Sequence, residues 1–110
     1  MKIELSKVGD VAIVKVYGRI DSSTADSFWQ TTDQILASGT SNFVVDCANL
    51  EFISSAGLRA LLTLSKNIRQ KSGIISLCCL SQQTKAVMDI AGILAFFKTY
   101  ANLEEALSHY

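Results

Sequence analysis

Serines are prominent among the side chains in this sequence that could do chemistry. Ser54 and Ser55 are adjacent, and two very small residues, Ala56 and Gly57, follow them at the expected start of a helix. A serine in this place has two interpretations: its oxygen caps the helix by accepting an unpaired backbone N–H, or it is a phosphorylation site. A phosphate there is compatible with the free N–H groups and the macrodipole of the helix. Phosphorylation would then change the surface and leave the fold intact.

A second polar segment also follows a strand and opens a helix. It contains Asp21, Ser22 and Ser23, and the spacing of Ser23 and Asp26 predicts that Ser23 caps the helix. The loops that follow parallel strands gather at one edge of an α/β sheet, which is the usual place for a ligand or partner. We therefore expect Asp21 to lie near Ser55, although the two residues are 34 positions apart.

Few other residues suit catalysis or metal binding. The only histidine is His109, and the cysteines Cys47, Cys78 and Cys79 form no Cys-x-x-Cys pair. A structural metal site and a nucleophile–histidine pair therefore lack the usual residues. The six glycines are isolated, so no phosphate-binding loop is present. We expect a non-enzymatic protein with no cofactor and no metal, whose cysteines are buried free thiols.

Length and composition narrow the class of protein further. A chain of 110 residues has the size of one domain, so residues 1–110 are expected to form a single unit. The hydrophobic fraction of 49% excludes disorder, and the balance of ten basic and ten acidic residues argues against nucleic-acid binding. Apolar runs such as Ile93–Phe97 are far shorter than a membrane span, and no apolar leader follows Met1. We expect a cytoplasmic protein without membrane insertion.

The hydrophobic pattern predicts two strands followed by repeated helix–strand units. The fold class is α/β, with a mixed four- to five-stranded sheet packed with about four helices. The expected strands are Lys2–Val8, Val11–Tyr17, Asn42–Asp46, Ile74–Leu80 and Phe96–Tyr100. The expected helices begin near Ser23, Leu58, Ser81 and Asn102, and a nine-residue irregular stretch, Cys47–Ser55, precedes the second of them.

Three segments of the chain resemble STAS domains, and more narrowly the bacterial anti-sigma factor antagonists. They are Gly18–Ala25, Phe52–Leu62 and Val87–Ile93, and their spacing extends the resemblance over essentially the whole chain. The resemblance implies a STAS-like fold, phosphorylation on the serine that matches Ser55, and a nearby acidic residue that matches Asp21. Ser54 stands where many members have Asp, which leaves Ser54 as the less favoured site of modification.

The resemblance also implies the partners. The unphosphorylated chain would bind an anti-sigma factor that is a serine kinase and so release a sigma factor. The kinase, with its own ATP, would phosphorylate Ser55, and a PP2C-type phosphatase would reverse the reaction. The expected partner surface consists of Asp21, Ser22, Ser23, Ser54, Ala56, Gly57, Leu58 and Arg59. Arg59 is alternatively a solvated surface side chain, and homodimerisation is left open.

Two other functions share the same fold. One is a constitutive STAS subunit of a membrane transport system, and the other is an adaptor in a partner-switching pathway that does not end on a sigma factor. Capture of a transport ATPase, with no phosphate on Ser55, would favour the first of these. An enzyme is a third class, against which the shortage of catalytic side chains argues.

Overall fold

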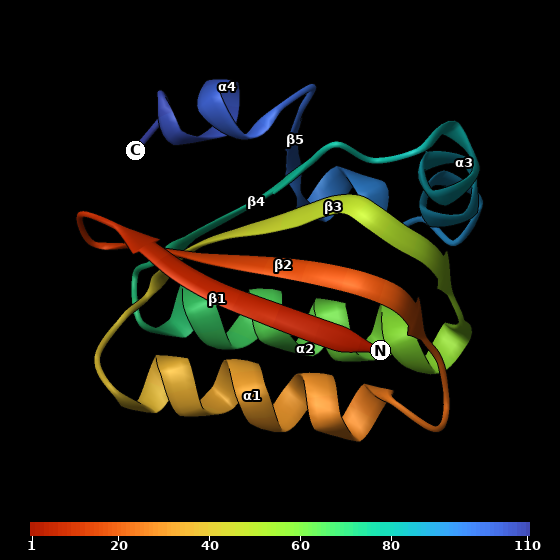
Figure 1. The fold of residues 1–110 in the computed structure, drawn as a ribbon, viewed down its shortest axis with the longest axis horizontal. Helices are drawn as coiled ribbons and strands as arrows, with labels where there is room; N and C mark the ends of the chain where they lie inside the picture. Colours follow the sequence, from red (N-terminus) through yellow and green to blue (C-terminus); the bar gives the residue numbers. More distant parts are fainter.

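One mixed sheet of five strands, flanked by four α-helices, organises the chain (Figure 1). The computed structural model describes all 110 residues. In chain order the elements are β1 (Lys2–Val8), β2 (Val11–Ile20), α1 (Ala25–Ala37), β3 (Asn42–Ile53), α2 (Ser55–Gln70), β4 (Ile74–Cys78), α3 (Gln82–Ile90), a 3₁₀ turn (Leu94–Phe96), β5 (Lys98–Tyr100) and α4 (Leu103–Leu107).

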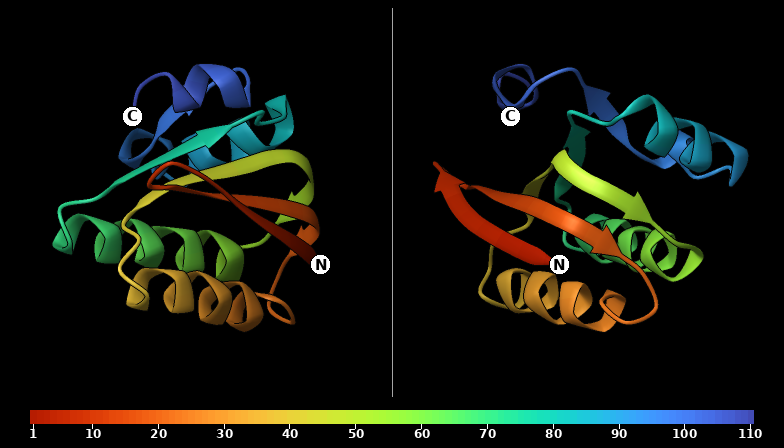
Figure 2. Two further views of the ribbon diagram at one scale, coloured as in Figure 1. Left: turned by 60° about the vertical axis from the view of Figure 1, so that its left-hand side comes forward. Right: turned by 45° about the vertical axis from the view of Figure 1, so that its right-hand side comes forward.

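The strands lie in the sheet in the order in which they occur in the chain. β1 and β2 form an antiparallel hairpin, and β2, β3, β4 and β5 are mutually parallel. α1 and α2 lie side by side under one face, while α4 lies against the other (Figures 1 and 2). The predicted α/β fold class and mixed sheet are therefore confirmed. No helix has the length and apolar character that crossing a membrane requires.

The central strands are apolar on both sides because helices cover both sides. On β2, Ala12, Val14 and Val16 belong to the main core under α1 and α2, whereas Val11 joins a smaller cluster with Ala106 of α4. The same division explains the run Phe43–Val45 on β3, where Phe43 and Val45 are in the main core and Val44 is in the smaller cluster. Because both faces of these strands are buried, apolar side chains do not alternate with polar ones, as they do on a strand that buries only one face.

β3 is longer than the sequence analysis predicted. We expected the strand to end at Asp46, but it continues to Ile53, so most of the stretch Cys47–Ser55 is strand. The pairing with β2 shifts between Lys15↔Asp46 and Tyr17↔Asn49, which is a bulge on β3. The Asp46 carboxylate accepts a hydrogen bond from the displaced Ala48 N–H at 3.0 Å. The extra residue disrupts the period-two pattern, which is why the strand looked shorter.

The helix starts were predicted with mixed success. Ser81 and Asn102 cap α3 and α4 as expected, since their side chains accept hydrogen bonds from Thr84 N–H and Glu105 N–H. The prediction for α1 was wrong: the capping position is Thr24 rather than Ser23, and it makes no side-chain capping bond. β2 also continues to Ile20, beyond the predicted end at Tyr17.

One buried hydroxyl has no partner, and its removal is expected to stabilise the protein. Ser65 on α2 is 1% exposed, and its Oγ makes no hydrogen bond. We expect Ser65→Ala to raise the free energy of unfolding by about 1 kcal/mol, because an unpaired buried polar group is removed and alanine favours the helix. Urea denaturation measures this change.

Ser76 on β4 provides the matched control for this substitution. It is equally buried, at 1% exposure, but its hydroxyl is hydrogen-bonded to the Tyr110 hydroxyl at 2.9 Å. Ser76→Ala should therefore lower the free energy of unfolding by about 1 kcal/mol. If the free energy of unfolding changed in the same direction in both variants, the result would contradict this account.

Candidate functional site

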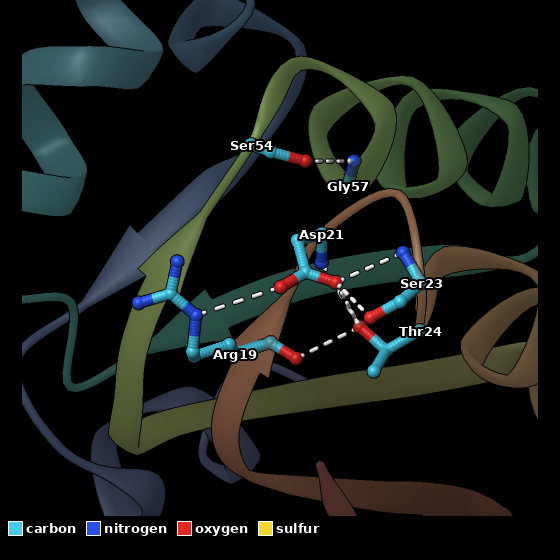
Figure 3. A network of polar contacts seen from close by, with 6 residues as sticks. All are labelled: Arg19, Asp21, Ser23, Thr24, Ser54 and Gly57. Atoms are coloured by element: carbon cyan, nitrogen blue, oxygen red, sulfur yellow. Dashed lines mark hydrogen bonds and ion pairs between the residues drawn. The ribbon is translucent and has the colours of Figure 1, made fainter.

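The ends of β2 and β3 bring the two polar segments together. Ile20 and Ile53 are paired in register, and the Ser54 N–H donates a hydrogen bond to the Ile20 carbonyl oxygen at 2.9 Å. Asp21 follows Ile20 and Ser54 follows Ile53, so the chain leaves the sheet at the same edge in both places. Figure 3 shows Asp21 lying beside the Ser54 turn. The expectation that the two segments meet at one edge is confirmed.

The adjacent serines occupy different positions. Ser54 is the N-cap of α2, with an extended backbone, and its Oγ accepts a hydrogen bond from the Gly57 N–H at 3.3 Å (Figure 3). Ser55 is the first residue of the helix and is exposed, whereas Ser54 is half-buried. The capping interpretation therefore applies to Ser54, and the Ser55 side chain projects from the helix start into solvent.

Gly57 and Leu58 belong to the interior of the protein. A methyl group on Gly57 would lie 2.6 Å from the Ile20 carbonyl oxygen and 2.7 Å from Cγ1 of Ile53. Leu58 is 8% exposed and is part of the main core. The close approach that Gly57 permits is therefore between α2 and the ends of β2 and β3. Both residues hold the Ser55 turn in place from inside.

Asp21 is the centre of a compact hydrogen-bonded turn (Figure 3). Its Oδ1 accepts hydrogen bonds from the Ser23 hydroxyl at 2.6 Å and the Ser23 N–H at 2.9 Å. Its own N–H donates to Thr24 Oγ1 at 2.9 Å, and the Arg19 Nε lies 3.5 Å from Oδ2. The Ser23 hydroxyl, then the Ser23 N–H and then Arg19, lower the pKa of the Asp21 carboxyl from its usual value.

The lowered pKa of Asp21 predicts a pH-dependent contribution to stability. The contribution is fully present above the unfolded-state pKa of about 3.9 and is lost as the pH falls through the lower folded-state value. We expect Asp21→Asn to have a lower urea midpoint than wild type at pH 7, and the difference should shrink on acidification below pH 3.9. In Ser23→Ala the Asp21 pKa, followed by carboxyl NMR, should move up toward the ordinary aspartate value. A difference between wild type and Asp21→Asn that grows in acid would contradict the assignment.

An open groove of about 340 Å³ separates the first turns of α1 and α2, next to the Ser55 turn. Half-buried Trp29 forms part of its wall, and exposed Arg59 lies at its rim. The groove is lined by Ser22, Ala25, Asp26, Trp29, Ala56, Arg59, Ala60 and Thr63. Three predicted partner-binding residues, Ser22, Ala56 and Arg59, are therefore part of one surface.

Some residues of this region were absent from the predicted set. Arg19 and Thr24 hold the Asp21 turn, and the Arg19 guanidinium also lies 4.4 Å from the centre of the exposed Phe52 ring. Thr24 stands three residues after Asp21, which is a recognisable spacing for a side chain that bonds back to a turn. The contact between Arg19 and Phe52 joins two strands and has no local sequence signal.

The STAS-domain family matches residues 2–106 of the chain. Because this match spans almost the whole sequence, and because fold and motifs agree with it, the chain belongs to the STAS-domain family. The predicted resemblance is confirmed.

Similar proteins include regulators of sigma factors. The candidate anti-sigma factor antagonist BtrV of Bordetella bronchiseptica is 33% identical over 106 residues, covering 96% of this chain and 90% of BtrV. The anti-sigma F factor antagonist of Paenibacillus polymyxa is 28% identical, covering 98% of this chain and 93% of that protein. The Bacillus cell fate determinant SpoIIAA, solved in its phosphorylated form, has the same fold, with a TM-score of 0.77, 16% identity and 98% coverage of both chains.

Proposed function

We propose that this protein is an anti-sigma factor antagonist whose binding to its partner is switched by phosphorylation on Ser55. The observation that carries the proposal is the difference between the two adjacent serines. The Ser54 hydroxyl is engaged as the helix cap, while Ser55 is exposed at the first position of α2. The names of the relatives at 33% and 28% identity support the sigma-factor pathway.

The switch operates through charge at a surface that is otherwise unchanged. A phosphate on Ser55 adds a charge of about −1.5 to −2 at the N-terminus of α2, where the macrodipole tolerates it. The same phosphate lies at the edge of the sheet that holds the Asp21 carboxylate. A partner that covers both groups must then desolvate two neighbouring negative charges. A loss of a few kcal/mol corresponds to an affinity about 10²-fold weaker.

The partner surface is the part of the predicted set that is not buried, which leaves out Gly57 and Leu58. Asp21, Ser22 and Ser23 form one side and Ser54, Ser55, Ala56 and Arg59 the other, with the groove between α1 and α2 running away from them. The partner is an anti-sigma factor with serine kinase activity, which supplies the ATP, and a PP2C-type phosphatase restores the hydroxyl. In this role the chain itself is not an enzyme, and it acts in the cytoplasm.

The decisive experiment compares the two serines. The full chain is incubated with ATP and the serine kinase of its own cell, and the phosphopeptide is mapped by mass spectrometry. Wild type and Ser54→Ala should gain one phosphate, and Ser55→Ala none. Ser54→Ala should also lose about 1 kcal/mol of stability with the helix cap, whereas Ser55→Ala should not.

Binding completes the test. The kinase should bind unphosphorylated wild type and Ser55→Ala, and should bind the phosphorylated chain about 10²-fold more weakly. Equal affinity for the two phosphorylation states would overturn the switch. Phosphate that appears on Ser54 in the Ser55→Ala variant, at the wild-type rate, would overturn the assignment of the site.

A further inference from the structure

A carboxylate and two thiols converge beneath α4, on the opposite face of the sheet from α1 and α2. One ligand atom each from Asp46, Cys78 and Cys79 lies within 4.8 Å of the other two. Asp46 on β3 is paired in register with Cys78, the last residue of β4. Neighbours in register point to the same face of a sheet, so these two side chains lie side by side.

The backbone of Cys79 brings the third side chain into the group. Its φ is +62°, in the left-handed region that residues other than glycine rarely adopt. In an extended strand the side chains of Cys78 and Cys79 would point to opposite faces. The left-handed turn removes this alternation. A hydrogen bond from the Cys79 N–H to the Tyr100 carbonyl oxygen at 3.1 Å fixes the turn against β5.

The Asp46 carboxylate has no cationic partner within the protein. Asp46 is 4% exposed, and its Oδ1 accepts a hydrogen bond from the Ala48 N–H at 3.0 Å. The only salt bridge of the chain joins Arg19 and Asp21, so no cationic side chain pairs with Asp46. A buried carboxylate is costly unless a cation or several hydrogen bonds compensate it. Two sulfur atoms beside it make a thiophilic metal ion a suitable cation.

We propose that Asp46, Cys78 and Cys79 form a binding site for a thiophilic divalent cation of the zinc class. Two thiol protons are released, two metal–sulfur bonds and one metal–oxygen bond form, and water takes the fourth position. With zinc–sulfur bonds of about 2.3 Å, tetrahedral donors lie about 3.5 to 3.8 Å apart. Each pair of ligand atoms must therefore approach by at most about 1.3 Å from the limiting separation of 4.8 Å.

The access to the site is from the side of Cys79. Cys78 is fully buried and Cys79 is half-buried, so the second thiol is the one nearer to solvent. Thiols coordinate metal ions as thiolates, so binding at Cys78 and Cys79 is accompanied by proton release.

Cadmium is the probe for this site, because the charge-transfer band of cadmium–thiolate bonds lies at longer ultraviolet wavelength than that of zinc–thiolate bonds and is better separated from the absorption of the peptide backbone. The reduced full-length chain is titrated with cadmium alone, and the stoichiometry is measured by native mass spectrometry. We expect one ion per chain and a band of two-thiolate intensity. Cys79→Ser should halve the band, and Asp46→Asn should weaken binding at least tenfold while the band remains.

The third cysteine provides the matched control. Cys47 is also buried, but it belongs to the main core on the other face of the sheet, where its thiol donates to the Val45 carbonyl oxygen. Cys47→Ser should bind cadmium as wild type does. Circular dichroism of each variant establishes that it is folded, and Cys79→Ser is preferred to Cys78→Ser because Cys79 is partly exposed. The absence of a band in wild type at excess cadmium, or its equal loss in Cys47→Ser, would overturn the proposal.

Discussion

Gly57→Ala is expected to lower the free energy of unfolding by roughly 2 to 3 kcal/mol and to slow phosphorylation of Ser55. The added methyl group would meet the Ile20 carbonyl oxygen at 2.6 Å and side-chain atoms of Ile53 and Ile20 at 2.7 and 2.9 Å. Alanine alone would favour a helix over glycine by about 1 kcal/mol, so the steric term must exceed this gain. The helix start has to move away from the sheet, and it carries Ser54 and Ser55 with it.

Urea denaturation and the rate of phosphate incorporation measure the two effects of Gly57→Ala. Ala56→Gly is the matched control, because it exchanges the same two residue types one position earlier, at a half-buried site. It should cost no more than about 1 kcal/mol through helix propensity, with the Ser55 turn in place. A Gly57→Ala variant as stable as wild type would show that the close contact does not exist.

Much of the architecture could be predicted because its signals are local. The break between the strands Lys2–Val8 and Val11–Tyr17, the helix starts at Ser81 and Asn102, and the apolar runs each depend on a few neighbouring residues. The order of helices and strands then defines a mixed sheet in which the loops of Asp21 and Ser55 meet. Parallel strands and right-handed crossovers leave few alternatives.

The errors fall at places where a bulge, a side-chain hydrogen bond or an unusual backbone conformation interrupts the regular pattern of a strand or helix. The β3 bulge, held by Asp46, hid the second half of that strand, and the Ser23 hydroxyl bonds to Asp21 instead of capping α1. Likewise, the predicted strand Ile74–Leu80 would have placed Cys78 and Cys79 on opposite faces of the sheet. The left-handed backbone of Cys79 places them together beside Asp46. Such conformations depend on β5 and α4 packing against β4 and have no sequence period of their own.

Because the net charge of the chain is zero, a single phosphate would determine the net charge of the phosphorylated protein. With ten basic and ten acidic residues, one phosphate would change the net charge from zero to about −2. The change is concentrated at one edge of the sheet, where Asp21 already carries a negative charge and is paired with Arg19. A partner that approaches this edge therefore encounters a surface of altered charge on an unaltered fold.

The connection between α2 and β4 contains a second glycine that the fold requires. α2 ends in a hydrogen-bonded turn in which Ser72 N–H donates to Arg69 O and Gly73 N–H donates to Ile68 O, both at 2.9 Å. This turn is the Schellman motif, and its left-handed residue is Ser72, with a φ of +59°. Gly73 itself is needed for space, because a methyl group on it would lie 1.9 Å from the Ser41 carbonyl oxygen.

Gly73→Ala is therefore expected to be the most destabilising of the substitutions considered, with a loss of about 3 kcal/mol and a Tm lower by roughly 10 to 20 °C. The obstacle is the backbone of Ser41, immediately before β3, and no rotation of a side chain relieves the clash. Ser72→Gly is the control one position earlier: it should raise stability by up to about 1 kcal/mol, because glycine adopts the left-handed conformation without strain. Phosphorylation of Ser55 in folded Gly73→Ala should match wild type, since the change lies at the opposite end of α2. If Gly73→Ala alters phosphorylation as strongly as Gly57→Ala does, the loss in both follows from global unfolding and the positioning role of Gly57 is wrong.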